Sequence, residues 1–331
     1  MLNIVRLLII GLGSIGNRHL TNIKASYPEV ETIILSRRDE LSSYEGCRVV
    51  HDLEIAMELD VQAAFICTPS VYHLGTANKL IERGIHVFIE KPVSNTSHGL
   101  SELKQKAEEM NVKVMIGYNL RFVDSLIFYR SLLQSEKYGK ALCVKAEVGQ
   151  YLPDWRAGVD YRDSASAKKS LGGGALLELS HELDFLSWIF GKPVYSSGTA
   201  TKVSNLEIDV DDLVIAHAGF ERNGTLTNAT IHLDFLQRKS FRQCKTICEQ
   251  GSILWDAIAD NVTLFSHDEE ITLYQGDMDR NRSYLAEIKA FIQAVKHNEE
   301  VPVSIEDGLR TMTVIDSIRS SSHSRQLFNE N

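Results

Sequence analysis

The chain has 331 residues, of which 44% are hydrophobic and 24% are charged, and its formal net charge at pH 7 is −9. This length exceeds that of a typical single hydrophobic core, so we expect a globular protein of two domains. The negative charge argues against nucleic acid and anionic membrane surfaces as partners, because both are polyanionic.

The five cysteines are scattered along the chain, which predicts reduced thiols in a cytoplasmic protein rather than a disulfide framework. Cys244 and Cys248 are close in sequence, but no second ligand pair follows at zinc spacing. We therefore predict no metal site. No apolar run has the length of a membrane-spanning helix, so we expect no membrane association.

The first 120 residues alternate short apolar runs with amphipathic stretches. The runs predict strands at 4–10, 31–36, 63–67, 86–90 and 113–117, and helical periodicity predicts helices at 15–26, 52–58, 72–83 and 97–110. Strands that are apolar along their whole length and alternate with helices indicate an α/β fold, a doubly wound parallel sheet of the Rossmann type. We therefore predict a first domain over residues 1–121, with its ligand at the carboxyl ends of the strands.

The pattern changes after about residue 122. The following elements are predicted in order: a helix at 122–135, a strand at 141–149, a polar connection at 151–174, a helix at 175–190, successive strands over 194–275, and helices at 281–297 and 305–321. Asn223-Gly224 between two alternating runs predicts a hairpin. Strands in succession without helices indicate an α+β domain over residues 122–331 with a mostly antiparallel sheet. We expect that its C-terminal helix can pack back on the first domain.

The first predicted strand ends in Gly11-Leu12-Gly13-Ser14-Ile15-Gly16 and opens a helix. In this pattern Gly11 permits a tight turn, Gly13 lets the backbone approach a pyrophosphate, and Gly16 lets helix and strand pack closely. The first backbone N–H groups of the helix, at Ser14 and Ile15, then face the phosphates. The turn therefore predicts dinucleotide binding.

The second predicted strand ends in Ser36-Arg37-Arg38 instead of an acidic residue. Guanidinium groups suit the 2′-phosphate of NADP, so we predict NADP, with NAD as the alternative cofactor. Asp39 and Glu40 follow directly, and they keep open the interpretation that the two arginines belong to a solvated turn.

Two further strand ends carry polar residues. Thr68-Pro69 and His73 follow the strand at 63–67, and Glu90-Lys91-Pro92 follows the strand at 86–90. Both segments lie where a doubly wound sheet places its ligand crevice, so we predict that they contact the coenzyme. A surface salt bridge from Lys91 to Glu90 is the alternative for this lysine.

These segments, together with later ones, resemble a single known family. The later motifs are Gly117-Tyr118-Asn119-Leu120-Arg121-Phe122 and Gly172-Gly173-Gly174, which runs on to His181-Glu182-Leu183-Asp184. In this order they resemble the glucose–fructose oxidoreductase/inositol dehydrogenase (Gfo/Idh/MocA) family over essentially the whole chain. The resemblance implies a Rossmann domain followed by an open-faced sheet that often forms oligomers, here a homodimer or homotetramer. It also implies oxidation or reduction of sugars, cyclitols and related polyols with NAD or NADP.

The resemblance assigns roles to individual residues. It implies that Lys91 contacts the reacting oxygen and the cofactor, and that His181 is the catalytic histidine. An imidazole can accept the hydroxyl proton as hydride leaves the same carbon, while an ammonium group stabilises the charge on that oxygen. The same resemblance implies that Asn119 contacts the cofactor and that Tyr118 and Arg121 contact the substrate.

The chain departs from the family pattern beside the histidine. Many members carry an aspartate four residues before it, where this chain has Leu177. Glu178 and Asp184 each lie three residues from His181 and would share its face of a continuous helix. Either carboxylate is a candidate partner of the imidazole. The alternatives are a domain-interface ion pair for Glu178 and a helix-surface contact for Asp184.

The polar connection at 151–174 is aromatic, and it contains Tyr151, Trp155, Arg156 and Tyr161. Aromatic faces stack on sugar C–H surfaces, and arginine binds hydroxyl, carboxylate or phosphate groups. We predict a substrate segment for a sugar or nucleotide-linked sugar. A clamp between domains or a dimer contact is the alternative.

Three functions fit these features. The first is an NADP-dependent sugar or polyol dehydrogenase, and the second is an enzyme that retains its nucleotide through a net non-redox sugar conversion. The third is a protein that binds NADP(H) without chemistry. The presence of both Lys91 and His181 argues against the third.

Overall fold

The computed structural model describes residues 4–37, 43–156 and 158–324. The chain divides into two compact units, Met1–Asn119 with Arg280–Leu309 (unit 1) and Leu120–Asp279 with Arg310–Asn331 (unit 2). The sequence-based boundary after residue 121 lies close to the end of the first segment of unit 1. Residues 280–309, which the sequence analysis placed in the second domain, belong to unit 1.

Unit 1 contains a seven-stranded sheet in the order β3-β4-β2-β1-β5-β6-β7. All its described pairings are parallel except that of β3 with β4. The strands are β1 Arg6–Ile10, β2 Glu31–Leu35, β3 Ser43–Tyr44, β4 Cys47–Val50, β5 Ala63–Ile66, β6 His86–Glu90 and β7 Val114–Gly117. The predicted doubly wound sheet is confirmed, and the strand order reverses between β1 and β5, where such sheets bind ligands.

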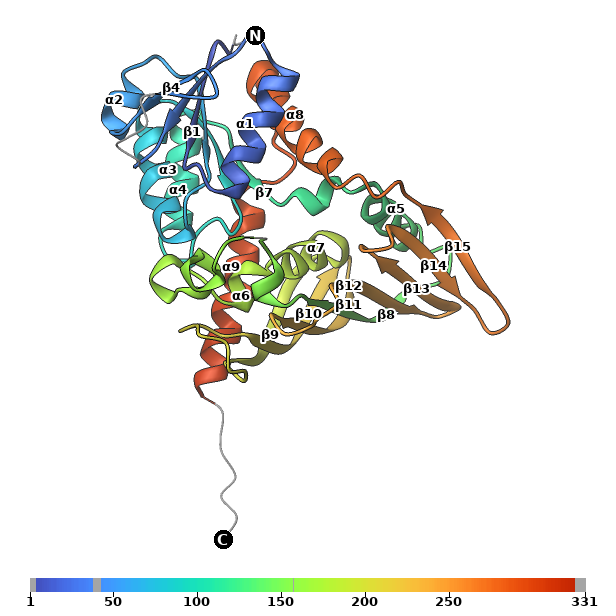
Figure 1. Ribbon diagram of the computed structural model, residues 1–331. Helices are drawn as coiled ribbons and strands as arrows, with labels where there is room; N and C mark the ends of the chain where they lie inside the picture. The colour runs from blue at the N-terminus through green and yellow to red at the C-terminus, as the bar shows by residue number, and fades with distance from the viewer. Residues whose placement is uncertain (1–3, 38–42, 157, 325–331) are drawn as a thin grey trace. The chain divides into compact units, whose positions relative to one another are not determined.

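Helices lie on both sides of this sheet. They are α1 Ser14–Ser26, α2 Leu53–Met57, α3 His73–Glu82, α4 Leu100–Glu109 and α8 Asn281–His297, with the 3-10 turn η1 Ser70–Tyr72. Figure 1 shows α1 beside α8 on one side, and α3 beside α4 on the other. Arg18 of α1 lies over the ring of Tyr284, 4.4 Å from its centroid, so α8 packs in unit 1 although it follows the second sheet in sequence.

The core of unit 1 is apolar on both faces of its strands. Leu7, Leu8 and Ile9 of β1 are fully buried, as expected for a parallel strand covered by helices on both sides. Phe65 and Phe88 stack at 4.8 Å, and Phe291 of α8 meets Phe65 edge-on at 5.4 Å. These rings pack α8 against the centre of the sheet.

Unit 2 contains an eight-stranded sheet in the order β15-β14-β13-β12-β8-β11-β10-β9. Its pairings are antiparallel except that of β11 with β8. The strands are β8 Ala141–Gly149, β9 Lys192–Thr201, β10 Leu213–Arg222, β11 Thr225–Asp234, β12 Phe241–Cys248, β13 Gly251–Asp256, β14 Asn261–Phe265 and β15 Glu270–Gln275. The predicted mostly antiparallel sheet is therefore confirmed.

The hairpin predicted at Asn223-Gly224 is confirmed between β10 and β11. Asn223 has φ 50° and Gly224 has φ 78°. Two successive positive φ values match the turn type that suits the right-handed twist of paired strands, and asparagine and glycine tolerate this conformation best.

Helices α5 Asp124–Gln134, α6 Ala175–Glu178 and α7 His181–Phe190 belong to unit 2, and Figure 1 shows α5 and α7 over the same face of its sheet. Trp255 of β13 donates its indole N–H to Ser125 Oγ of α5 at 2.9 Å. Helix α9, Ile305–His323, begins in unit 1 and continues into unit 2.

The continuous helix predicted over 175–190 is wrong. It breaks at Leu179, whose φ −99° and ψ 28° are not helical, and Ser180 then caps α7. Apolar residues continue on both sides of the break because both helices are buried, so hydrophobic periodicity does not reveal it. Glu178 and His181 therefore do not share one continuous helical face.

The connection between β8 and α6 is built from short helical turns rather than extended loop. These are η3 Leu152–Asp154, η4 Tyr161–Asp163, η5 Ala165–Ala167 and η6 Lys169–Leu171. Polar side chains of these turns form ion pairs. For example, Arg162 pairs with Asp160 at 2.6 Å and with Glu207 at 2.8 Å.

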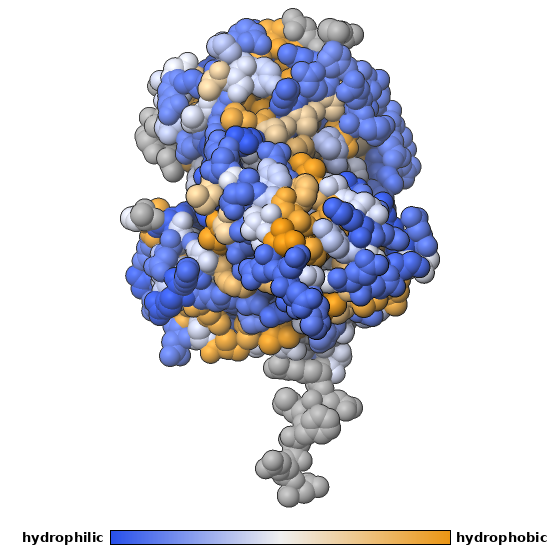
Figure 2. All heavy atoms as spheres, turned by 90° about the vertical axis from the view of Figure 1, so that its right-hand side faces the viewer, coloured by the Kyte–Doolittle hydropathy of each residue, from blue (hydrophilic) through white to orange (hydrophobic). Residues whose placement is uncertain are grey.

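Strand residues of unit 2 alternate between buried and exposed, and some of the exposed ones are large and apolar. Ile215, Leu226 and Ile247 are 48%, 47% and 44% exposed. The face drawn in Figure 2 likewise shows apolar patches among hydrophilic residues. Among the described residues, no helix combines the length and apolarity that a membrane crossing requires.

Candidate coenzyme and substrate site

The three glycines of the turn after β1 meet different surroundings. Gly11 has φ +97°, and a Cβ on it would lie 3.0 Å from the Cys67 carbonyl oxygen at the end of β5. A Cβ on Gly16 would lie 2.0 Å from the Gly11 carbonyl oxygen, whereas a Cβ on Gly13 meets nothing within 4 Å. The turn is therefore closed at its first and third glycines, where a Cβ would meet neighbouring atoms, and open at the second, where a Cβ would meet none. This arrangement fits a pyrophosphate that approaches the backbone at Gly13.

Helix α1 begins directly at this opening. Gly13 is its N-cap, without a side-chain cap hydrogen bond, and its first turn carries no acidic residue. The N–H groups of Ser14 and Ile15 belong to the first turn, where helical N–H groups have no intrahelical partner. The helix start therefore suits an anion.

The end of β2 carries the residues predicted to select the cofactor. Ser36 is buried, and its carbonyl oxygen bonds to His51 Nδ1 at 2.8 Å. The Arg37 guanidinium lies 5.0 Å from the centroid of the Tyr72 ring. Arg38 lies outside the described residues, as do Asp39 and Glu40.

The end of β5 is joined to the end of β6 through His73. Its Nε2 lies 2.7 Å from the Thr68 carbonyl oxygen, and its Nδ1 lies 2.9 Å from the Pro92 carbonyl oxygen. Burial lowers the pKa of His73. The imidazole thus holds two loops in place. The Thr68 hydroxyl is buried and has no hydrogen-bond partner among the described residues.

Glu90 at the end of β6 is engaged on two sides. Its Oε1 lies 2.6 Å from His19 Nε2, and its Oε2 accepts the Lys91 backbone N–H at 3.2 Å. Lys91 is half-buried, and its peptide bond to Pro92 is cis. The carboxylate therefore fixes the backbone at which the Lys91 side chain starts.

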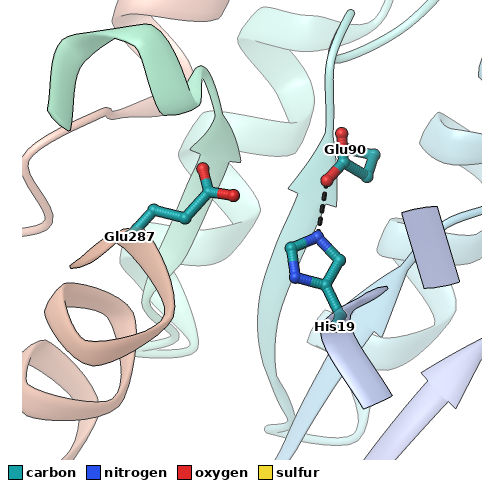
Figure 3. Close-up of side chains that lie close together, drawn as sticks. All are labelled: His19, Glu90 and Glu287. Atoms are coloured by element: carbon teal, nitrogen blue, oxygen red, sulfur yellow. Dashed lines mark hydrogen bonds and ion pairs between the residues drawn. The ribbon is translucent and has the colours of Figure 1, made fainter. Parts of the chain in front are cut away.

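His19 and Glu287 were not predicted from the sequence. Figure 3 shows the Glu287 carboxyl group, from α8, directed toward the pair formed by His19 and Glu90. One side-chain atom of each of the three residues lies within 4.8 Å of the other two, and all three are buried. We call these residues the His19 cluster. Burial, and then the Glu90 charge, raise the pKa of Glu287 well above its usual range, while Arg18 acts in the opposite direction.

The end of β7 carries Tyr118 and Asn119, which are both buried. Asn119 donates its side-chain amide to Ser283 Oγ of α8 at 3.0 Å. In unit 1 the ends of β1, β2, β5, β6 and β7 thus bring together the residues predicted to bind the cofactor, with the exception of Arg38.

In unit 2, His181 is the first residue of α7 and is buried. The next residue, Glu182, is also buried and pairs with Arg242 Nε of β12 at 2.8 Å. The sequence analysis did not single out this ion pair. Glu178 lies on α6, beyond the helix break.

Asp184 binds Arg121 through two hydrogen bonds. Arg121 Nε lies 2.9 Å from Asp184 Oδ2, and its NH2 group lies 2.7 Å from Asp184 Oδ1. Both residues are buried, and the Arg121 guanidinium also lies 5.7 Å from the centroid of the Trp188 ring. The structure therefore joins two residues for which the sequence suggested separate roles.

The aromatic residues of the substrate segment lie in unit 2. Trp155 donates its indole N–H to the Gln150 carbonyl oxygen at 3.1 Å, and the Tyr161 hydroxyl accepts the Glu207 N–H at 3.1 Å. Arg238 lies over Tyr151, 3.6 Å from its ring centroid. A shallow, solvent-open hollow is lined by Leu152, Pro153, Trp155, Arg156, Val159, Tyr161 and Ser164.

Two family models match the chain. The one described as "Oxidoreductase family, NAD-binding Rossmann fold" matches residues 5–118, and the one described as "Oxidoreductase family, C-terminal alpha/beta domain" matches residues 130–328. Inositol 2-dehydrogenase of Rhizobium meliloti (strain 1021) is 25% identical and covers 98% of this chain and 98% of its own. The scyllo-inositol 2-dehydrogenase (NADP(+)) IolW of Bacillus subtilis (strain 168) is 22% identical, with 95% of this chain and 92% of its own covered.

Solved structures have a similar fold over almost the whole chain. Levoglucosan dehydrogenase in complex with NADH gives a TM-score of 0.84 at 20% identity and covers 96% of this chain and 97% of its own. The WlbA dehydrogenase from Bordetella pertussis in complex with NADH and UDP-GlcNAcA gives 0.81 at 19% identity, with 97% of each chain covered. At these identities the similarity shows the fold.

Proposed function

We propose that this chain, which belongs to the Gfo/Idh/MocA oxidoreductase family, transfers hydride between a nicotinamide coenzyme and a CH–OH group of a sugar, nucleotide-linked sugar or polyol. The observation that carries the proposal is the glycine turn, which is closed at Gly11 and Gly16 and open at Gly13. It stands at the start of α1 and beside the end of β5, where the strand order reverses.

The coenzyme supplies the acceptor or donor of hydride when it is bound. Gly13 and the first N–H groups of α1 would hold its pyrophosphate. The buried Thr68 hydroxyl and the Asn119 amide provide polar groups at the ends of the neighbouring strands.

We assign the proton chemistry to Lys91 and His181. The imidazole of His181 accepts the proton of the substrate hydroxyl, and the Lys91 ammonium stabilises the negative charge that develops on the same oxygen. Glu90 supports this assignment, because it holds the Lys91 backbone N–H. On α7, the ion pair of Glu182 with Arg242 anchors the residue next to His181.

Asp184 is engaged with Arg121, so we assign it to holding that guanidinium for the substrate rather than to the imidazole. Glu178 is then the remaining candidate for the acidic partner of His181. Glu178→Gln should lower kcat and shift its pH profile, whereas Asp184→Asn should chiefly raise the substrate KM. The opposite pattern would exchange the two roles.

For the cofactor we propose NADP. Arg37 lies on the face of Tyr72 at the end of β2, where a guanidinium can bind a 2′-phosphate. The scyllo-inositol 2-dehydrogenase (NADP(+)) IolW is similar to 95% of this chain, which supports the proposal. Arg37→Ala should reduce the preference for NADP over NAD about tenfold or more in kcat/KM. A wild-type enzyme that prefers NAD would refute this proposal.

For the substrate we propose a sugar or nucleotide-linked sugar bound by Lys91, Tyr118, Arg121, Tyr151, Trp155, Arg156, Tyr161 and His181. Trp155 and Tyr161 line the hollow of unit 2, and aromatic rings of this kind stack on sugar C–H surfaces. The similar proteins include inositol 2-dehydrogenase, levoglucosan dehydrogenase and the WlbA dehydrogenase in complex with UDP-GlcNAcA, and inositol, levoglucosan and UDP-GlcNAcA share a ring that bears several hydroxyl groups.

The absorbance of reduced nicotinamide tests the function directly. The purified protein is mixed with NADP or NAD and a panel of inositols, sugars and UDP-sugars. A net change that requires both Lys91 and His181 supports the proposal. Bound coenzyme that turns over without a net change indicates a non-redox conversion, and binding without any response to substrate indicates a sensor.

We also propose that the outer face of the unit 2 sheet forms a homodimer or homotetramer. Ile215, Leu226 and Ile247 are exposed on it, and apolar side chains clustered on one face are typical of protein contacts. The oligomeric state in solution, measured by analytical ultracentrifugation, tests this proposal.

A further inference from the structure

The His19 cluster connects three segments of unit 1 behind the residues assigned to the coenzyme. His19 belongs to α1, whose first turn begins at Gly13, and Glu90 ends β6 directly before Lys91. Glu287 belongs to α8, which the chain adds to unit 1 only after the second sheet. Glu90 Oε2 accepts the Lys91 backbone N–H at 3.2 Å, so Glu90 links the cluster to that backbone.

Glu287 has the most demanding environment of the three residues. It is fully buried, and neither of its carboxyl oxygens has a hydrogen-bond partner among the described residues. The Glu90 carboxyl group lies within 4.8 Å of it. A second negative charge at this distance in a buried site is strongly unfavourable, so one proton or one cation must compensate it.

The charged and titratable groups around Glu287 come from several elements. They are Arg18 and His19 of α1, Cys67 after β5, and Glu90 of β6. The Arg18 guanidinium lies on the Tyr284 ring. His19 Nε2 already pairs with Glu90 at 2.6 Å. With these partners in place, a proton on Glu287 balances the cluster with the least rearrangement.

We propose that Glu287 is a positioning residue of the coenzyme site: as a neutral carboxylic acid it faces the His19–Glu90 pair and keeps Glu90 in the place from which it holds Lys91. This role rests on the proposed function, because it acts through Lys91. When Glu287 loses its proton, the two carboxylates repel each other, Glu90 moves, and the coenzyme site loosens. Coenzyme affinity therefore falls in alkaline solution.

Two substitutions separate charge from shape. Glu287→Gln is neutral at every pH and keeps a polar side chain of the same shape, whereas Glu287→Leu has a similar size and no polar atom. Equilibrium binding of NADPH and NADH, followed by fluorescence from about pH 6 to about pH 9, is measured for the wild type and both variants, and kcat is recorded in parallel. Thermal unfolding of each variant shows that it is folded.

We expect Glu287→Gln to bind within about threefold of the wild type near neutral pH and to lack its alkaline loss. The wild type should lose up to about tenfold in affinity for each pH unit above the pKa of Glu287, since one proton is linked to binding. Glu287→Leu should bind about tenfold more weakly at every pH. Equal pH profiles of wild type and Glu287→Gln, or wild-type affinity in Glu287→Leu, would refute the positioning role.

Two further results would have a different meaning from those above. A wild-type protein that binds no nicotinamide dinucleotide refutes the proposed function itself. A rise in the unfolding temperature on addition of Mn²⁺ or Zn²⁺ that Glu287→Gln abolishes refutes the neutral acid, since it would place a cation in the cluster.

Discussion

Replacing single glycines of the turn by alanine separates coenzyme binding from folding. A Cβ at Gly16 would lie 2.0 Å from the Gly11 carbonyl oxygen, which belongs to the backbone and cannot turn away as a flexible side chain can. A Cβ at Gly13 meets nothing within 4 Å, and the φ of −75° at this position suits alanine. Gly16→Ala should therefore damage the fold, and Gly13→Ala should damage only binding.

The magnitudes follow from the same geometry. Ordinary contact begins at 3.4 Å, so Gly16→Ala must displace backbone atoms by more than an ångström. Overpacking costs up to about 3 kcal/mol, and the better helix propensity of alanine returns about 1 kcal/mol, which leaves about 2 kcal/mol of destabilisation. For Gly13→Ala, the loss of a tolerated N-cap and the smaller entropy of the unfolded chain offset each other to within about 0.5 kcal/mol. Its methyl group should weaken coenzyme binding at least about tenfold, or about 1.4 kcal/mol.

Urea unfolding and equilibrium coenzyme titration of each variant measure these two effects. Gly75→Ala in α3 is the matched control, because its Cβ also meets nothing within 4 Å and it lies outside the turn. It should gain about 0.5–1 kcal/mol in stability and bind coenzyme normally. Wild-type affinity in Gly13→Ala, or wild-type stability in Gly16→Ala, would refute the assignment of the turn.

Three more predictions concern stability and assembly. Asp184→Asn should destabilise the protein by about 3–5 kcal/mol in urea unfolding, because it leaves the Arg121 charge buried without its carboxylate; a loss below about 1 kcal/mol would contradict this. Since the folded-state pKa of Glu287 is raised, its contribution to stability is complete below the unfolded pKa and is lost as pH rises toward the folded pKa. Glu287→Gln should therefore gain about 1.4 kcal/mol on the wild type per pH unit in that window, and parallel pH–stability curves would contradict it. Leu226→Arg should reduce the molecular mass seen by ultracentrifugation without changing the far-UV circular dichroism, and an unchanged mass would exclude this face from the contact.

The sequence predicts the elements best where they are apolar along their whole length. The runs at 4–10 and 86–90 correspond to β1 and β6, because a strand buried on both faces must be apolar throughout. β4 was missed because Cys47–Val50 is short and Arg48 interrupts it. The break at Leu179 was missed because hydrophobic periodicity records burial, and burial continues across the break.

The glycine turn and the polar strand ends were predictable because each is a local pattern whose role depends on its own backbone. The partners of buried charges were not. Glu287 lies on a helix that the periodicity identified correctly, but its neighbours His19 and Glu90 come from distant segments. Arg121 and Asp184 were each singled out, yet nothing local indicated that they bind one another. A sequence can thus mark a buried polar residue as unusual without naming its partner.

The buried carboxyl groups of the two units have different partners, and we expect this difference to decide how sensitive each unit is to pH. On α7, Glu182 and Asp184 lie in the first turn, where the helix dipole favours anions, and each has an arginine as partner. Permanent guanidinium charges make this arrangement insensitive to pH, which suits a helix that presents His181 in a fixed orientation. The His19 cluster instead consists of an imidazole and two carboxyl groups, and no arginine belongs to it. By our proposal the cluster holds Lys91 only while Glu287 keeps its proton. The alkaline limit of coenzyme binding should therefore arise in unit 1 and not at α7.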